Sequence, residues 1–269
     1  MLNQEQGYEE NRNDFQEINT NIEKMGFYSI PPEKNQVEDN EEKIPFYVKI
    51  IMFACGFSYG GFFLLNVIFL LFTGKTKTED ITIGDEVFVI SGVYFTLFAI
   101  FLFFIFTYRK YFASKLKNPS LYLKGLIFGV VTIGIEMGVG MIMNTILPAE
   151  TNANQQTIID YTQAYPILMF IVTVFIGPLC EEMTYRVGLF EAIKEKNETV
   201  ALIATSLIFA AIHISFQDTT ARAELNALPV YMAIGFCLTY CYKKYGLAAS
   251  YVAHVLLNLL SFLAILSQI

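Results

Sequence analysis

The sequence predicts an all-α fold, a polytopic transmembrane helix bundle with about seven spans. Its 269 residues are 54% apolar and 16% charged, whereas a soluble domain carries about 25% charged residues. The apolar residues recur in stretches of roughly 20, the length that a helix needs to cross a bilayer. The period-two alternation typical of a membrane β-barrel is absent from the sequence. Because backbone groups in lipid must be hydrogen-bonded internally, these stretches are predicted to be helices.

An acidic tail precedes the first span. Residues 1–44 hold eleven acidic and four basic side chains, so the whole net charge of −7 lies there. Such a segment buries too little apolar surface to offset the entropy of ordering, and we expect it to be mostly disordered in the cytoplasm. Residues 45–269 are predicted to form the membrane bundle. The acidic balance argues against a nucleic-acid partner.

The first three predicted spans are long apolar runs. They cover residues 50–73, 87–108 and 121–147, and the second ends at a loop rich in Lys and Arg. The third span carries Gly134 and Gly138 four residues apart. Small residues at this spacing let two helices approach closely, so we expect a helix contact there.

The remaining four spans follow with short connections. They cover residues 165–190, 199–216, 228–242 and 247–266. The first of these contains Pro178, which removes a backbone hydrogen bond and is expected to kink the helix.

The basic residues predict the orientation of the bundle. Of the 18 Lys and Arg, 15 lie in the tail and around the loops after spans two, four and six, and three lie on the opposite side. Basic flanks stay in the cytoplasm, which places the N-terminus inside and the C-terminus outside. The chain is thus predicted to be an integral, multi-pass membrane protein in contact with the lipid bilayer.

Six ionisable side chains lie inside the predicted spans, where a charge costs roughly 3 kcal/mol and usually serves function. They are Glu136, Glu181, Glu182, Arg186, His213 and His254. Adjacent helical residues diverge by about 100°, so Glu181 and Glu182 point to different faces. Glu182 and Arg186 are four residues apart and can pair on one face. That pairing leaves Glu181 as the carboxylate available for chemistry.

Two further pairs stand one helical turn apart, Phe209 with His213 and His254 with Asn258. A Glu and a His can together hold and deprotonate a water molecule. A second His with an Asn can donate hydrogen bonds to a developing oxyanion. This set of groups suits hydrolysis of an amide. Alternatively, Glu181, His213 and His254 could ligate zinc with one position open for water.

The series Glu-Glu-x-x-x-Arg, Phe-x-x-x-His and His-x-x-x-Asn resembles the CPBP family of intramembrane proteases. That family includes the type II CaaX prenyl endopeptidases and the bacterial Abi, or bacteriocin-immunity, proteins. The resemblance covers roughly residues 165–260. It implies that Glu181 is the catalytic glutamate, that His213 helps it to activate water, and that His254 and Asn258 stabilise the oxyanion.

The resemblance also implies supporting roles around the site. Glu182, Arg186 and Phe209 would orient the catalytic groups. The family's chemistry implies a glutamate-activated water with no metal or other cofactor, and zinc is the alternative. In the prenyl endopeptidases a further helix follows the His-x-x-x-Asn helix, whereas eleven residues follow Asn258. Whether the substrate is prenylated therefore stays open.

One geometric mismatch accompanies this assignment. At 1.5 Å per residue, Glu181 and His254 are expected roughly 10 Å below the cytoplasmic face, whereas His213 is expected roughly 20 Å deep. The fifth span would have to begin deeper, or tilt, for the three side chains to meet.

The function predicted from these features is an intramembrane endopeptidase that cuts a peptide or membrane-protein substrate near the cytoplasmic side. The alternative is a non-enzymatic membrane protein for bacteriocin self-immunity or regulation of a membrane partner. A third hypothesis, a proton-coupled transporter with Glu136 in a relay, is disfavoured because no internal repeat is seen. The family pattern and short loops indicate a bacterial plasma membrane, and the oligomeric state stays open.

Overall fold

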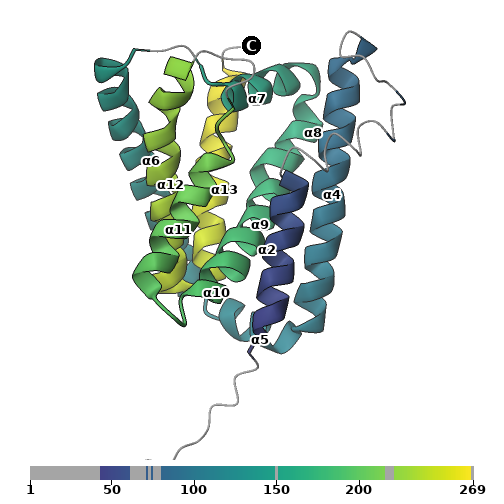
Figure 1. Cartoon of the computed structure of the whole chain (residues 1–269), viewed down its shortest axis with the longest axis vertical. Helices are drawn as coiled ribbons and strands as arrows, with labels where there is room; N and C mark the ends of the chain where they lie inside the picture. The colour runs from purple at the N-terminus through teal and green to yellow at the C-terminus, as the bar shows by residue number, and fades with distance from the viewer. Residues whose placement is uncertain are drawn as a thin grey trace, which may run out of the picture. The chain divides into compact units, whose positions relative to one another are not determined.

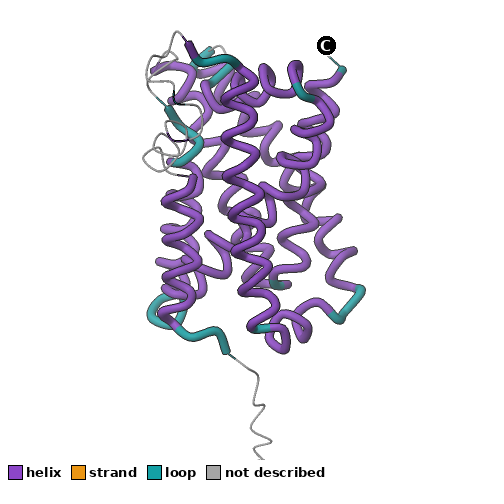
Figure 2. The backbone as a smooth tube through the Cα atoms, turned by 90° about the vertical axis from the view of Figure 1, so that its right-hand side faces the viewer, coloured by secondary structure: helices purple, strands orange, loops and turns teal. Residues whose placement is uncertain are grey.

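The computed structural model describes residues 43–60, 71, 74, 80–148, 151–215 and 221–267 of the chain. These residues are helical or lie in short loops, and none of them forms a strand (Figure 2). The predicted tail lies outside the described residues except for its last two positions. One of those, Ile44, is buried in the core, so the packed bundle begins slightly before the predicted boundary. Most of the second half of predicted span one also lies outside the described residues.

The helices follow the predicted spans closely (Figure 1). In the first half they are α2 (Phe46–Gly60), α4 (Ile83–Thr107), α5 (Arg109–Leu116), α6 (Ser120–Ile146) and α7 (Ala153–Ala164). A continuous helical segment follows, made of α8 (Pro166–Ile171), η2 (Val172–Ile176), α9 (Gly177–Glu181), η3 (Glu182–Phe190) and α10 (Glu191–Ile193). The chain then forms α11 (Glu198–Ala211), α12 (Ala221–Tyr245) and α13 (Leu247–Leu266).

Membrane-crossing length separates these helices into two classes. Among the described residues, five helical segments are long and apolar enough to cross a bilayer, including the continuous segment Pro166–Ile193. Phe46–Ser58 and Glu198–Ala211 are apolar but shorter. The predicted polytopic helical bundle is confirmed. The two helices without a predicted span, α5 and α7, are too polar or too short to show as apolar stretches.

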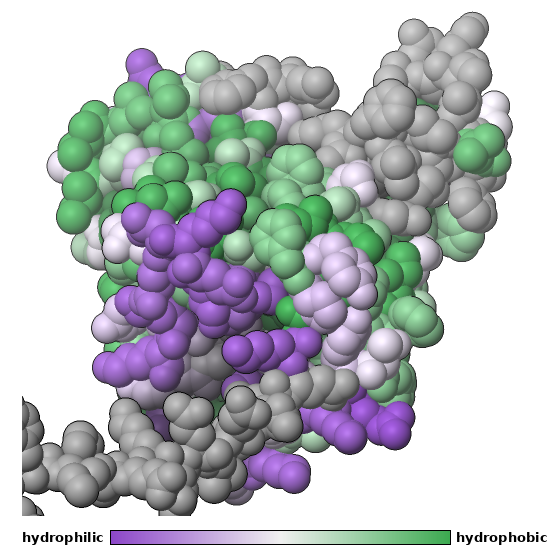
Figure 3. Space-filling model, turned by 60° about the horizontal axis from the view of Figure 1, so that its bottom comes forward, coloured by the Kyte–Doolittle hydropathy of each residue, from purple (hydrophilic) through white to green (hydrophobic). Residues whose placement is uncertain are grey.

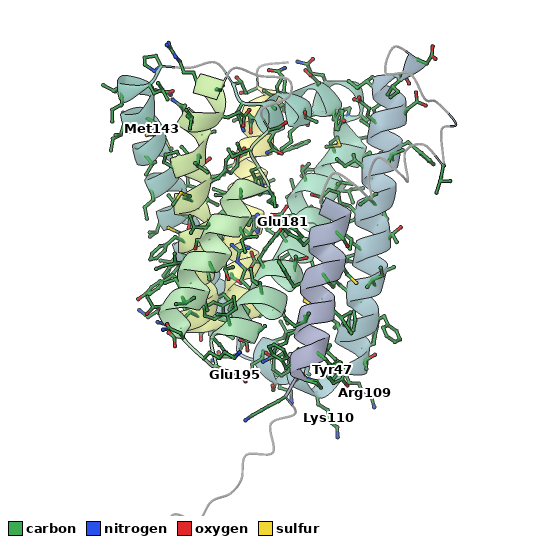
Figure 4. The ribbon with its side chains drawn as sticks, viewed as in Figure 1. Tyr47, Arg109, Lys110, Met143, Glu181 and Glu195 are labelled. Atoms are coloured by element: carbon green, nitrogen blue, oxygen red, sulfur yellow. The ribbon has the colours of Figure 1, made fainter. Side chains whose placement is uncertain are left out.

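The two ends of the bundle differ in charge. One end, here called the basic end, holds the start of α2, all of α5 and the α12–α13 junction, and Arg109 and Lys110 mark it in Figure 4. Its described cationic residues are Lys43, Lys49, Arg109, Lys110, Lys115, Lys117, Lys124, Lys194, Lys196, Lys243 and Lys244. Figure 3 shows hydrophilic surface gathered at this end. By the positive-inside rule we expect this end to face the cytoplasm. The opposite end carries α7 and is called the α7 end.

A buried ionic network holds three helices together at the basic end. The Lys49 ammonium, 6% exposed, donates to the backbone carbonyl of Glu191 at 3.1 Å and lies 2.9 Å from Glu195 Oε1. The Tyr242 hydroxyl donates to Glu191 Oε1 at 3.0 Å. The network therefore links α2 and α12 to the residues at the end of α10.

Close helix packing on α6 occurs at other glycines than the sequence predicted. Among the described residues, no atom would lie within 4 Å of a Cβ added to Gly134 or Gly138, so the predicted contact there is wrong. Instead, a Cβ on Gly125 would lie 2.6 Å from the Ala249 carbonyl oxygen, and one on Gly129 would lie 3.2 Å from Ala253 Cα. The contact between α6 and α13 is therefore tight near the basic end of α6, because small residues meet there on both helices.

Candidate active site

Glu181 lies midway along the continuous segment Pro166–Ile193, inside the bundle (Figure 4). Two stretches of this segment, η2 and η3, are wound as π-helix. The Gly177 N–H bonds to the carbonyl of Val172, five residues earlier, directly before Pro178, which has no N–H to donate. The π-helical stretch η2 thus accommodates the proline, and η2 and η3 lie on either side of Glu181 along the segment. Such turns inside helices are frequent at functional sites.

A fully buried ion pair stands behind Glu181. Glu182 and Arg186 are both 0% exposed, and Arg186 Nη1 lies 3.1 Å from Glu182 Oε1. The guanidinium also lies over the Phe209 ring, 4.8 Å from its centroid. The predicted pairing of Glu182 with Arg186 on one face is therefore present. A buried charge of this kind is stable only with a partner, so each residue of the pair depends on the other.

The buried pair positions His254. Its Nδ1 lies 3.0 Å from Glu182 Oε1, and because the carboxylate paired with Arg186 accepts, Nδ1–H is the donor. His254 therefore turns its other nitrogen, Nε2, towards Glu181 Oε2 at 3.6 Å. The Glu181 side chain is 17% exposed, whereas His254 is nearly enclosed at 3%. One imidazole thus connects a buried, fixed carboxylate to an accessible one.

His213 lies just beyond the helix that the sequence predicts to carry it. Helix α11 ends at Ala211, and His213 occupies the following turn, so the predicted shared helix face with Phe209 is wrong in detail. The two residues still meet, because His213 Nδ1–H donates to the Phe209 carbonyl at 2.7 Å and the rings are 4.6 Å apart. This bond leaves His213 Nε2 as the nitrogen available to the site.

Three residues that the sequence did not single out hold His213 in place. The Tyr231 ring stacks on the imidazole at 4.6 Å, and the Tyr231 hydroxyl accepts from Asn154 at 3.0 Å. The Asn152 amide donates to the His213 carbonyl at 3.2 Å, and its side-chain oxygen caps the start of α7. An Asn directly before a helix is a capping signal in the sequence. The contact of Asn152 with His213, by contrast, cannot be predicted from the sequence.

Glu224 organises the same region from α12. Its side chain is fully buried and accepts from the backbone N–H of Ala153 at 2.8 Å and of Ser215 at 3.1 Å. These bonds tie the start of α7 and the turn after α11 to α12. The sequence gives little indication of this role, because Glu224 is an acidic residue at the edge of an apolar stretch. It lies just before the predicted sixth span, which begins at residue 228.

Asn258 joins the site from α13. Its amide nitrogen donates to the Thr173 carbonyl at 2.8 Å, within the π-helical stretch η2. An amide nitrogen carries two hydrogens, so this bond uses one and leaves the second. The carbonyl of Thr173 has been freed by the altered hydrogen-bond register of η2.

The four predicted catalytic residues line one cavity of about 510 Å³. Glu181, His213, His254 and Asn258 all contribute to its wall, and Phe209 does as well. Glu182 and Arg186 lie behind the wall. The structure therefore brings together in space the residues that the motifs placed on three separate helices.

The depth mismatch expected from the sequence does not exist. Glu181, His213 and His254 line the same cavity, and His254 Nε2 lies 3.6 Å from Glu181 Oε2. The side chains therefore meet although they come from different positions along their helices.

The cavity extends away from the basic end. Beyond the catalytic groups its wall is formed by residues of α7, by Asn144 near the end of α6, by Asn226 near the start of α12 and by Ile265 near the end of α13. All of these belong to the α7 end of the bundle. The prediction of a site that opens towards the cytoplasm is therefore at odds with this geometry, since the positive-inside rule assigns the α7 end to the other side.

The zinc alternative stays a prediction. A catalytic zinc needs three protein ligands about 2 Å from the ion. Among the described residues, no three His, Cys, Asp or Glu side chains are grouped so that they could hold one metal ion.

The fold and this site together define a multi-pass integral membrane protein with a carboxylate–histidine centre inside the bundle. Comparison with known families agrees. Residues 163–260 match the family described as type II CAAX prenyl endopeptidase Rce1-like. This segment contains α8 to α13 up to Asn258, so the resemblance to the CPBP family is confirmed for the part of the chain that holds the site.

Three bacterial relatives are similar over parts of their length. A Mycoplasma capricolum protein named "Uncharacterized protein" is 34% identical over 39% of this chain and 30% of its own. A Bacillus subtilis protein named "Putative membrane peptidase YdiL" is 37% identical over 34% of each chain. A Lactococcus lactis protein named "UPF0177 protein YvdC" is 27% identical over 45% of this chain and 44% of its own. The chain thus matches less than half the length of each relative. No solved structure matches it.

Proposed function

We propose that the chain is an intramembrane endopeptidase in which Glu181 activates a water molecule to hydrolyse a peptide bond. The observation that carries this proposal is the juxtaposition of Glu181 with His254 at 3.6 Å in a cavity, with His254 anchored to a buried ion pair. The Rce1-like match over the same helices and the peptidase name of one relative support it. A cavity of about 510 Å³ has room for a few residues of an extended peptide.

The proposed chemistry needs only this chain's side chains and water. Glu181 accepts a proton from water as the water oxygen bonds to the scissile carbonyl carbon. The carbonyl oxygen then becomes an oxyanion, which the second amide hydrogen of Asn258 and a doubly protonated His254, donating through Nε2–H, stabilise. The carbon–nitrogen bond breaks, and the proton held by Glu181 passes to the leaving amine nitrogen. The products are a carboxylic acid and an amine, and Glu181 is regenerated.

His213 has a positioning and proton-binding role in this scheme. Its Nδ1–H is committed to the Phe209 carbonyl, so Nε2 can accept a hydrogen bond from the attacking water. The stacked Tyr231 ring holds the imidazole plane in place. Catalytic groups held by such secondary contacts keep the geometry that proton transfer requires.

The test is a comparison of isosteric variants in purified, lipid-reconstituted protein. The protein is incubated with a peptide library, and cleaved termini are identified by mass spectrometry. We expect Glu181→Gln to lower the cleavage rate at least 100-fold, the usual contribution of a general base. Glu195→Gln, at an exposed carboxylate of the basic end, is the matched control and keeps the rate. A Glu181→Gln protein with an unchanged rate would overturn the role of Glu181, and a wild-type protein that cleaves no peptide would favour the non-enzymatic alternative.

A further inference from the structure

We propose that Glu136 is a specificity-determining residue that binds a cationic group of the substrate, a Lys or Arg side chain or an α-ammonium. This proposal rests on the proposed peptidase function and names the class of substrate. It starts from the charge of the cavity wall. Two carboxylates, Glu136 and Glu181, contribute to that wall, and none of the described Lys or Arg residues does. An apolar cleft with charge of one sign concentrates ligands of the opposite sign.

Glu136 is poorly explained as a structural residue. It lies in the middle of α6, a helix that buries few of its side chains, at a position where a carboxylate in lipid is costly. Among the described residues it has no hydrogen bond or ion pair. Glu136 shares the cavity wall with Tyr231, the ring that stacks on His213.

The packing of α6 leaves Glu136 accessible from the cavity side. The tight contacts of α6 with α13 lie at Gly125 and Gly129, near the basic end. Farther along the same side of α6, a Cβ at Gly140 would meet no described atom within 4 Å. At that level α13 packs elsewhere, since its Phe262 belongs to a core cluster with residues of α4, α7 and the α8–η2 segment. The two helices therefore separate towards the α7 end, with the cavity between them.

The outer part of the cavity is suited to a peptide backbone. Its polar wall residues include neutral amides, which can donate to and accept from peptide groups without selecting a side chain. They are Asn144, Asn152, Asn154, Gln155 and Asn226. Neutral amides bind the chain of a peptide, so selection by charge falls to Glu136. The substrate class is then a peptide, or a juxtamembrane segment, with a basic residue on the non-cytoplasmic side.

The test uses two peptides that differ at one side chain, Arg in one and uncharged citrulline in the other, each embedded in a sequence that the wild-type protein cleaves. We expect Glu136→Gln to raise KM for the Arg peptide about tenfold or more, with kcat nearly unchanged. KM for the citrulline peptide should stay the same. Glu136→Lys should reverse the preference between Arg and Glu at this position. Glu195→Gln serves as the control acid outside the cavity.

Binding provides an independent readout that does not require cleavage. Fluorescence anisotropy of the labelled Arg and citrulline peptides is measured on Glu181→Gln protein and on the Glu136→Gln, Glu181→Gln double variant. The proposal predicts tighter binding of the Arg peptide, and loss of that preference in the double variant. Equal loss for both peptides, or no loss for either, would overturn it. Failure of the peptidase proposal has a different signature, namely a Glu181→Gln protein that still cleaves.

Discussion

The buried Glu182–Arg186 pair allows stability and activity to be separated. Both side chains are 0% exposed, and removing one partner of a buried pair costs about 3–5 kcal/mol because the other charge is left uncompensated. Arg186→Met also removes the contact with the Phe209 ring at 4.8 Å, worth about 2 kcal/mol when desolvated. We expect either single variant, Arg186→Met or Glu182→Gln, to lose at least about 3 kcal/mol of unfolding free energy. In a domain of this size that lowers Tm by roughly 6–20 °C.

The double variant is the informative one. The double variant leaves no uncompensated buried charge, which is the main cost of either single variant, so Glu182→Gln with Arg186→Met should recover most of the lost Tm. It should not recover activity, because a neutral amide at position 182 cannot anchor the His254 Nδ1–H as a carboxylate does. Stability would then be restored while cleavage stays low.

The chain supplies its own probe for the melting assay. It contains no Trp, but three of its four free cysteines are buried and react with a thiol-reactive fluorophore on unfolding. They are Cys180, Cys237 and Cys241. Lys243→Met, which removes an exposed ion pair with Glu198, is the control and should cost less than about 1 kcal/mol. A double variant that is as unstable as the sum of the singles, or that is fully active, would refute the reasoning.

Three other predictions follow from single contacts. Gly125→Ala should destabilise the bundle by about 1–3 kcal/mol, because the new Cβ would lie 2.6 Å from the Ala249 carbonyl oxygen. Gly138→Ala is the control: its Cβ would enter open space, so Tm should stay unchanged or rise. Equal changes of Tm in the two variants would contradict the packing described. The Lys49 ammonium lowers the pKa of Glu195. The stability from this pair is therefore present above the ordinary glutamate pKa of 4.5 and is lost as the pH falls through the lowered value. Lys49→Met should remove this contribution to the fall of Tm at acidic pH. Cleavage should survive 1,10-phenanthroline, and a loss of activity that zinc restores would support the metal alternative.

The candidate site was largely predictable because its residues are rare in their surroundings. Ionisable side chains are costly in apolar spans, so Glu181, His213 and His254 stand out in the sequence without any knowledge of contacts. Their assembly around one cavity is a tertiary fact, as is the route Arg186–Glu182–His254–Glu181. Tyr231 was missed because an aromatic residue in a span carries no signal of what it stacks on.

The sequence by itself determined the helical bundle, because the transfer of apolar groups between water and lipid depends on each segment alone. The orientation stays a prediction from the cationic loops. Only the tertiary structure decided which helix faces meet. Gly125 and Gly129 lie on the face of α6 that packs against α13, whereas the equally small Gly134 and Gly138 lie on the opposite face. The cavity extends towards the α7 end. Helix contact depends on where two axes cross, which residues far apart in the chain settle together.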